Sequence, residues 1–309
     1  MNADFQRAGL QVLERGWLSS NNILFDADAD ADSETTIVDT GYASHADQTL
    51  ALVRAGLRGR RLDRIVNTHL HSDHCGGNHA LQQAHGCAID VPADMKDAVD
   101  RWDEAALTYR DTGQSCPRYR RSGVLVAGTS IRLGRHDWDV QASPGHDPHS
   151  VVLHQPDAQI LISADALWEN GFGVVFPELD AIDAFDAVRA TLELIATLRV
   201  RWVIPGHGAP FSDVAAALAR AHQRLDAMQA QPLKHARHAA KVLIKFHLLE
   251  VQAVTHAELD TWIAATPYFE RLHGRHFADA PFAAWTRALL TELRQVGALR
   301  LDGERVVNL

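Results

Sequence analysis

The stretch His69-Leu70-His71-Ser72-Asp73-His74 constrains the fold of this chain more than any other part of the sequence. It places three imidazoles and one carboxylate within six residues, directly after the short apolar segment Ile65-Val66. These side chains are metal ligands, and packing gives no reason to gather them. A fold that accommodates them must end a strand here and turn at once into a helix, with cations holding the ligands together. The stretch therefore indicates a two-metal hydrolytic site, and such a site needs further ligands elsewhere in the chain.

Hydrophobic periodicity predicts alternating strands and helices over the first two thirds of the chain. Short β-branched or apolar runs predict strands, and runs with apolar residues three or four positions apart predict helices. The predicted strands are 22–25, 35–38, 65–66, 87–91, 130–133, 138–142, 150–154, 159–163 and 202–204, and the predicted helices are 45–57, 78–85, 94–107 and 182–198. This alternation is typical of an α/β fold built as a layered sandwich.

A change of composition at Gln231-Pro232 predicts a domain boundary. Residues 1–232 are then the catalytic domain with a linking helix, and residues 233–309 are a small C-terminal module. The pattern in that module predicts helices at 239–252, 255–264 and 282–296, the second opened by a capping box, and a hairpin over 299–307 that turns at Asp302-Gly303. Three helices and a terminal hairpin favour a winged-helix-like module.

Composition limits the partners and the compartment. The formal net charge is −9, which disfavours non-specific attraction to nucleic acid or to anionic membranes. The three cysteines form no C-x-x-C pair, and this low, odd count favours a reducing compartment. We find neither a signal-peptide core nor an apolar run of membrane-spanning length, so the sequence predicts a cytoplasmic protein without membrane contact.

Three more candidate ligands stand where predicted strands end. His146 follows Ser143-Pro144-Gly145, Asp165 follows the strand 159–163, and His207 follows the strand 202–204. The intervals from His74 onward are 72, 19 and 42 residues, enough for complete supersecondary units between them. Strand ends can present ligands without opening the core, so we expect these three side chains to complete the site.

With these residues identified, the chain resembles the metallo-β-lactamase-fold superfamily. Four motifs follow one another in the order of that family: T-H-L-H-S-D-H-C-G-G at 68–77, S-P-G-H at 143–146, S-A-D-A-L at 163–167 and P-G-H-G at 205–208. The resemblance covers residues 1–212 and is closest to the glyoxalase II (hydroxyacylglutathione hydrolase) group. It implies a four-layered αββα sandwich followed by the small C-terminal helical, winged-helix-like module.

The resemblance also implies how the ligands are shared between two metals. One metal would be held by three histidines, the other by one aspartate and two histidines, and a second aspartate would bridge them. In order these are His69, His71 and His146; Asp73, His74 and His207; and Asp165. Imidazole and carboxylate together favour two divalent ions, with zinc preferred and iron or manganese compatible. Such a pair would share a hydroxide, and Asp73 would orient it as the catalytic carboxylate and pass its proton to the leaving group.

The ligand set excludes some activities of the fold and leaves others open. True β-lactamases of this fold lack the bridging carboxylate, so Asp165 argues against β-lactam hydrolysis. Flavodi-iron relatives have Glu where His71 stands, which argues against oxygen or nitric oxide reduction. The leading hypothesis is a zinc-dependent hydrolase of a small thioester, ester or lactone. Ribonuclease or phosphodiesterase activity is the alternative within the fold, because a winged-helix-like tail is similar to the lactamase-β-like-2 group, although no basic stripe supports it.

A rival hypothesis from another class is a regulatory or interaction protein. Its C-terminal module would bind a partner or DNA, and its metal site would be vestigial. The complete ligand set speaks against this, because a decaying site loses ligands first. The sequence predicts a small-molecule acyl substrate as the principal partner, and it leaves a homodimer through the C-terminal module open.

Weaker candidates surround the metal ligands. Trp168, Phe172 and Phe176 follow Asp165 in a glycine-containing loop, and they either form an apolar wall for an acyl chain or pack beneath the loop as core. Asp39 ends the strand 35–38 and either supports the metal site or only caps a turn. His149 either supports His146 or simply begins a strand. We interpret Cys75 as packing rather than as a ligand.

Overall fold

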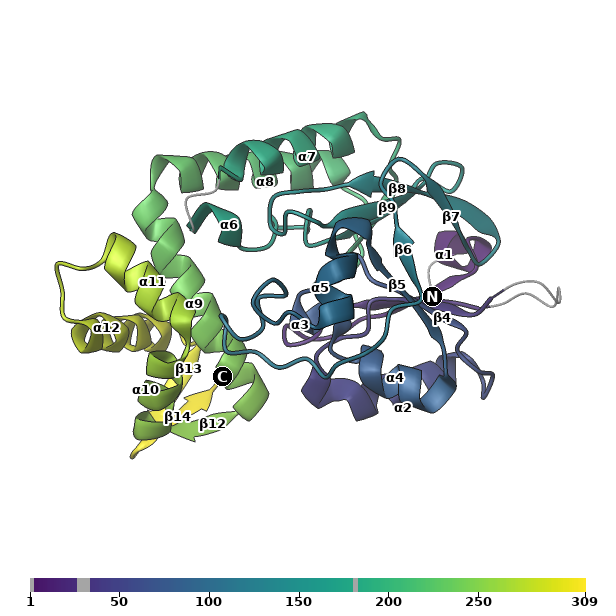
Figure 1. The fold of residues 1–309 in the computed structure, drawn as a ribbon. Coiled ribbons are helices and arrows are strands. Elements are labelled where there is room, and N and C mark those ends of the chain that lie inside the picture. The colour runs from purple at the N-terminus through teal and green to yellow at the C-terminus, as the bar shows by residue number, and fades with distance from the viewer. Residues whose placement is uncertain (1–2, 27–33, 180–182) are drawn as a thin grey trace. The chain divides into compact units, whose positions relative to one another are not determined.

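The computed structural model describes residues 3–26, 34–179 and 183–309. These residues form two compact units. Unit 1 comprises residues 1–107 and 116–226, and unit 2 comprises residues 108–115 and 227–309. The chain is drawn in Figure 1 from purple at the N-terminus to yellow at the C-terminus. No helix among the described residues is long and apolar enough to cross a membrane.

Unit 1 contains two mixed β-sheets. The first has the strand order β1-β2-β3-β4-β5-β6, in which β1 to β3 run antiparallel to their neighbours and β3 to β6 run parallel. Its strands are β1 (Leu10–Leu13), β2 (Asn22–Phe25), β3 (Thr36–Val38), β4 (Arg64–Val66), β5 (Ala88–Pro92) and β6 (Gly123–Leu125). Parallel strands point their carboxyl ends to the same edge, so the segments that follow β3 and β4 meet there.

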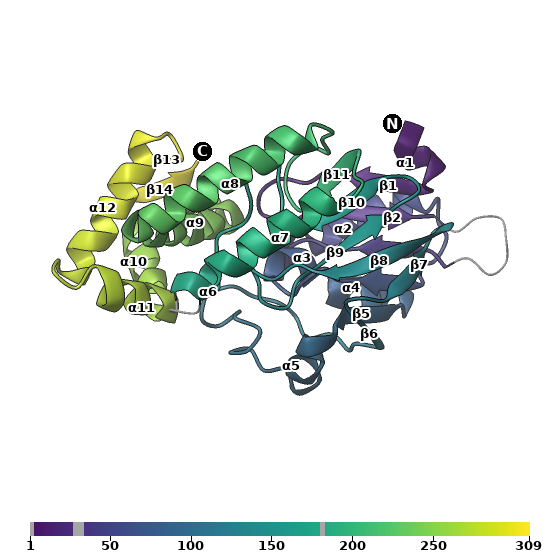
Figure 2. The ribbon, with the colours of Figure 1, turned by 90° about the horizontal axis from the view of Figure 1, so that it is seen from above.

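The second sheet has the order β11-β10-β9-β8-β7, which Figure 2 shows as a fan of neighbouring strands. Only β10 and β11 run parallel in this sheet, and its other pairs are antiparallel. Its strands are β7 (Ser130–Leu133), β8 (His136–Ala142), β9 (Val151–Gln155), β10 (Ile160–Ala164) and β11 (Trp202–Pro205). The carboxyl ends of β10 and β11 therefore also lie together.

The two sheets pack face to face through one apolar core. Strands of both sheets supply it, with Phe25 and Val66 among the residues from the first sheet and Trp138 and Leu153 among those from the second. The Phe25 and Trp138 rings meet edge to face with centroids 5.4 Å apart. Because every one of these side chains is fully buried, the core fixes both sheets and the strand ends that carry the site.

Helices cover the outer faces of unit 1 (Figure 1), with α2 and α4 beyond the first sheet and α7 and α8 beyond the second. The helices are α1 (Ala3–Arg7), α2 (Ala46–Gly56), α3 (Ser72–Cys75), α4 (Asn78–His85), α5 (Lys96–Arg101), α6 (Phe176–Leu179), α7 (Phe185–Thr197) and α8 (Val214–Ala230), with 3-10 turns at Ala43–His45 and Ala93–Met95. The predicted helix 94–107 stops at Arg101 because Trp102 adopts a left-handed conformation (φ 55°). The start of the predicted helix 182–198 includes Ile182, which lies outside the described residues.

Unit 2 combines four helices with a small antiparallel sheet of order β12-β14-β13. Its elements are α9 (Pro232–Val251), β12 (Ala253–Thr255), α10 (His256–Ala265), α11 (Pro267–His276), α12 (Phe282–Gln295), β13 (Leu299–Asp302) and β14 (Arg305–Asn308). The predicted hairpin and the capping box of Thr255 and Glu258 are both confirmed. The prediction missed β12 and α11, which begins with Pro267 only two residues after α10 ends.

The predicted domain boundary at Gln231-Pro232 stays a prediction, and in the structure Pro232 begins the new helix α9 there. The short segment 108–115, however, belongs to unit 2 although it is remote in sequence. The carbonyl of Asp111 accepts from the Tyr268 amide (3.1 Å), and its carboxylate pairs with Arg271 (2.8 Å). Individual polar contacts such as these produce no hydrophobic periodicity, so the sequence could not predict that residues 108–115 belong to unit 2.

Candidate metal centre

The predicted ligand stretch begins in the segment after β4 and ends within the one-turn helix α3, which includes Asp73 and His74. A helix this short is not stable alone, and its surroundings hold it. The Thr40 amide donates to the carbonyl of His74 (2.7 Å), and the Ser20 amide donates to the carbonyl of Asp73 (2.9 Å). A Cβ at Gly76 would overlap the backbone of Ala43, so glycine at this position lets α3 approach that segment.

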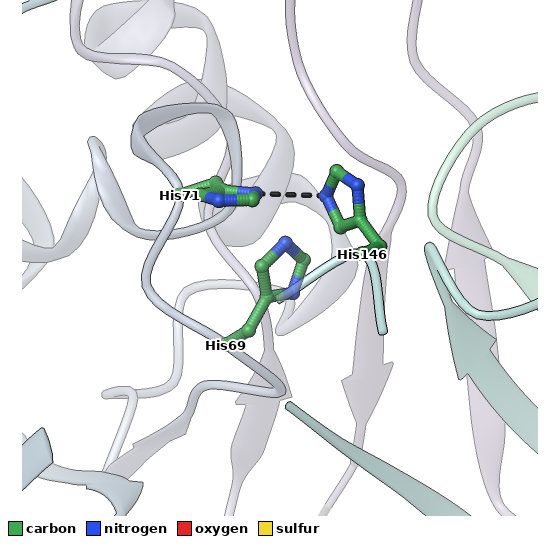
Figure 3. A group of neighbouring side chains, drawn as sticks. All are labelled: His69, His71 and His146. Atoms are coloured by element: carbon green, nitrogen blue, oxygen red, sulfur yellow. Dashed lines mark hydrogen bonds between the residues drawn. The ribbon is translucent and has the colours of Figure 1, made fainter. Parts of the chain in front are cut away.

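Three histidines form the first cluster: Figure 3 shows His69 and His71, from the segment after β4, pointing toward His146, from the segment after β8. His146 Nδ1 lies 2.6 Å from the carbonyl oxygen of Val174. A carbonyl only accepts, so Nδ1 carries the proton and Nε2 keeps its lone pair. That Nε2 lies 2.8 Å from His71 Nδ1. The third member, His69, has a buried Nε2 without a hydrogen-bond partner in the described part of the chain.

Two aspartates and two histidines form the second cluster. His207 Nε2 lies 3.1 Å from Asp73 Oδ2, and His74 Nε2 lies 3.4 Å from Asp165 Oδ1. His207 follows β11 and Asp165 follows β10, so the parallel pair of strand ends brings them together. The ligand atoms within each cluster all lie within 4.8 Å of one another, the spacing that one cation needs.

Asp165 lies between the clusters and faces both. Its Oδ2 is 3.4 Å from His146 Nε2, and its Oδ1 is 3.4 Å from His74 Nε2. The Trp168 indole Nε1 donates to Oδ1 (3.2 Å). Glycine at position 206 leaves room for the Asp165 carboxylate, because a Cβ on residue 206 would overlap Asp165 Oδ1. The carboxylate therefore has the placement that a bridging ligand requires.

Asp39 determines which ring nitrogens of His69 and His74 carry a proton. It is 2% exposed, and its Oδ2 lies 2.8 Å from His74 Nδ1 and 2.7 Å from Thr68 Oγ1. Since a carboxylate only accepts, both groups donate to it. The Thr68 hydroxyl must then accept from His69 Nδ1, 3.1 Å away. One buried carboxylate thus directs the Nε2 lone pairs of His69 and His74 into the site.

Burial and charge set the protonation of these groups. Burial lowers the pKa of His146 to about 4, helped by the neighbouring His71. Burial, with His74 and His71 close by, places the pKa of His69 well below its ordinary value. Burial acts the same way on His74, but the carboxylates around it, Asp165 first, raise its pKa well above the ordinary value. His69 and His146 are therefore neutral imidazoles at neutral pH, whereas His74 holds a proton that a cation would replace.

The residues present fit a pair of divalent cations. The buried Nε2 atoms of His69 and His74 have no hydrogen-bond partner among the described residues, an arrangement that is costly unless a cation occupies the space. Imidazole nitrogens and carboxylate oxygens are the donors preferred by zinc, iron and manganese ions. The two clusters are consistent with a dinuclear site, and their donors do not decide between these metals.

The weaker candidates divide between the site and the core. Trp168 contacts Asp165, and the Phe176 ring lies 6.0 Å from the rings of both His71 and His146. Phe172 is only 1% exposed and packs under the Arg224 guanidinium. His149 turns its Nδ1 toward Asp94 Oδ2 (3.9 Å).

The buried thiol of Cys75 lies against backbone carbonyls of its own turn, those of Leu70 (3.4 Å) and His71 (3.3 Å), which agrees with its interpretation as packing.

Sequence reasoning missed three residues at the site. Thr68 relays the Asp39 contact to His69. Asp147 is buried and places Oδ2 3.7 Å from His71 Nε2. Trp17 stacks on His207 with ring centroids 5.4 Å apart. Asp147 directly follows a predicted ligand, which was a usable signal, whereas nothing in the local sequence links Trp17 to a residue 190 positions later.

Comparison with known proteins agrees with this geometry. The family model described as "Metallo-beta-lactamase superfamily" matches residues 15–207. A hydroxyacylglutathione hydrolase from Rhizobium johnstonii is 28% identical over 154 residues, which cover 49% of this chain and 52% of that protein. The acyl-coenzyme A thioesterase MBLAC2 from Gallus gallus is 29% identical over 153 residues, which cover 46% and 55%. The chain thus spans about half the length of these curated relatives.

A solved structure extends the likeness over nearly the whole chain. A beta-lactamase domain protein from Burkholderia ambifaria superposes with a TM-score of 0.59 and 22% identity, covering 97% of this chain and 93% of that one. At this identity the likeness shows the fold alone. The family match includes all seven residues of the two clusters, in the order and at the strand ends described above. The chain belongs to the metallo-beta-lactamase superfamily.

Proposed function

We propose that this protein is a dinuclear metal-dependent hydrolase that cleaves a small thioester. The observation that carries the proposal is the position of Asp165, with one carboxylate oxygen directed at each cluster. Three histidines would hold one metal, Asp73, His74 and His207 the other, and Asp165 would bridge them. We favour zinc for both sites because of the histidine-rich donor set.

Bound divalent ions would supply an activated water near neutral pH and polarise the scissile carbonyl. The protein's own side chains would then transfer the protons of the reaction. Burial tends to raise the pKa of Asp73, but His74 and His207 hold it below its ordinary value, so this carboxylate is ionised at neutral pH. It can accept the proton of the attacking water and deliver it to the departing thiolate sulfur. Water thereby adds across the carbon–sulfur bond, giving a carboxylic acid and a thiol.

The thioester assignment rests on the relatives. Both a hydroxyacylglutathione hydrolase and an acyl-coenzyme A thioesterase are similar to about half of this chain. Esters and lactones are chemically equivalent targets and belong in the same assay. The net charge of −9 disfavours the ribonuclease alternative. The winged-helix-like description of unit 2 and a dimer formed through it stay predictions.

A substrate panel tests the proposal. Protein loaded with zinc, iron or manganese is assayed on a glutathione thioester, an acyl-coenzyme A, a simple ester, a lactone and an RNA. We expect thioester hydrolysis that Asp165→Asn lowers at least about 100-fold, as expected for a lost metal ligand. Asp97→Asn, an exposed aspartate on α5, is the matched control. Cleavage of RNA without turnover of any acyl substrate would overturn the proposal.

A further inference from the structure

The loop between β1 and β2 carries an unusual exposed aromatic side chain. Trp17 is 59% exposed, and it is the only aromatic among the large exposed apolar residues of the described chain. A tryptophan gains much by burial, so leaving one in water without a role is unfavourable. The next residue, Leu18, is 4% exposed and anchors the loop in the core. Because the buried Leu18 anchors the loop, Trp17 is exposed at a defined place and not because the loop is flexible.

Backbone hydrogen bonds tie this loop to the candidate metal centre. The Ser20 amide donates to the Asp73 carbonyl (2.9 Å), and the Asn21 amide donates to the Gly206 carbonyl (2.6 Å). The Asn21 side chain adds bonds to the carbonyls of Pro205 (2.9 Å) and Gly208 (2.7 Å). The loop is thus bound to the segments on both sides of His207, and Trp17 has a fixed place beside the second cluster.

Two tryptophans surround His207 on this side. The Trp17 ring lies nearly parallel to the imidazole, at 13° and 5.4 Å, and meets Trp168 edge to face at 5.5 Å. Trp168 in turn meets His207 at 5.5 Å and donates to Asp165. We call Trp17 and Trp168 the aromatic shelf. It extends an apolar surface from the metal ligands out to solvent.

We propose that the aromatic shelf binds the acyl chain of the substrate and makes the enzyme selective for extended apolar acyl groups; this rests on the thioesterase function proposed above. The Arg15 guanidinium near the shelf is directed at Asn22, Thr49 and Gln48, so it is not directed at a bound carrier. Glu14, three residues before Trp17, is exposed and would repel an anionic carrier. An uncharged hydrocarbon chain is the part of a thioester that suits this surface.

A chain-length series tests the assignment on metal-loaded protein. Each methylene laid on the shelf strengthens binding by at most about fourfold, the equivalent of one buried CH₂. We expect kcat/KM to rise from the acetyl to the hexanoyl thioester. Trp17→Ala should lower the hexanoyl value at least about tenfold and the acetyl value less than about threefold, and Trp17→Phe should restore most of the preference. Val126→Ala, which shortens another exposed apolar side chain of unit 1, should change neither value.

A binding measurement separates this inference from the proposed function. Calorimetric titration with acetate and with hexanoate should show tighter binding of hexanoate, and Trp17→Ala should abolish the difference. If no thioester is hydrolysed but this difference is seen, the proposed function fails and the shelf stands. If thioesters are hydrolysed without chain-length preference, or if Trp17→Ala lowers every substrate equally together with the metal content, Trp17 only shields His207 and the inference is overturned.

Discussion

Replacing Asp39 with asparagine should weaken the metal site without touching any ligand. Asparagine keeps the shape of the side chain and tolerates the left-handed backbone of this position (φ 56°). Its carbonyl oxygen can still accept from the Thr68 amide, which now donates to Asp39 Oδ1 (2.9 Å). Its NH₂ group, however, faces the Thr68 hydroxyl and His74 Nδ1 in place of an acceptor. His74 must then carry its proton on Nε2, where the metal should bind.

The expected loss follows from these contacts. Carboxylates that orient metal-binding histidines contribute about 10–100-fold to metal affinity, equivalent to about 1.4–2.7 kcal/mol. Two buried hydrogen bonds to a charged acceptor are also lost, at about 1.5–3 kcal/mol each. We therefore expect weaker binding of the second metal in chelator competition and an earlier urea midpoint for Asp39→Asn. For the exposed control Asp97→Asn, the affinity for the second metal and the urea midpoint should both equal the wild-type values within error. A variant that retains two metals at wild-type affinity and unfolds within about 0.5 kcal/mol of wild type would refute the reasoning.

Three further predictions concern separate parts of the molecule. Gly206→Ala forces a methyl group against Asp165 Oδ1, so it should lower activity at least about 100-fold, whereas Gly16→Ala, which meets no atom within 4 Å, should not. Elemental analysis should find two metals per chain in wild type and one in His71→Ala; an unchanged count would contradict the assignment of that cluster. Arg237, then Lys241, lowers the pKa of Glu292, so this carboxylate stabilises unit 2 above the unfolded pKa and the effect disappears as pH falls through the folded one. Glu292→Gln should therefore cost about 0.5–1 kcal/mol at pH 7 and progressively less as the pH falls through the folded pKa in urea titrations, and a difference that does not change with pH would exclude the ion pair as the cause.

The metal clusters were accessible to sequence reasoning because their ligands lie in the segments that follow strands. His69 to His74 are contiguous, and His146, Asp165 and His207 follow apolar runs whose length and composition mark them as strands. The parallel pair β10–β11 then brings Asp165 and His207 together, since the carboxyl ends of parallel strands lie at the same edge. The local pattern therefore carried both the identity of the residues and their approximate place.

Relationships between distant segments were not accessible in the same way. Which nitrogen of His74 faces the candidate metal site depends on Asp39, 35 residues earlier, and the position of Trp17 depends on bonds to Gly206. The segment 108–115 joins unit 2 through single hydrogen bonds. Such contacts are made by individual polar atoms and impose no periodic pattern, so only the folded chain shows them. The same reason explains why Phe172 could not be assigned to core or site from its place in a glycine-containing loop.

The charge balance of the site links its architecture to the reaction. Four carboxyl groups, Asp39, Asp73, Asp147 and Asp165, share it with the imidazoles of His69 and His146, which burial keeps neutral. Two divalent cations would bring four positive charges against these four carboxylates once the proton of His74 is displaced, so the loaded site would be close to neutral. A carbonyl substrate enters such a site neutral and becomes anionic as water adds to it, in a surrounding of low dielectric constant where charge acts strongly. The attraction between the cations and this developing charge is absent from the bound ground state, so it would stabilise the transition state more than the substrate. A phosphodiester carries its negative charge from the start, and the same cations would also stabilise its ground state.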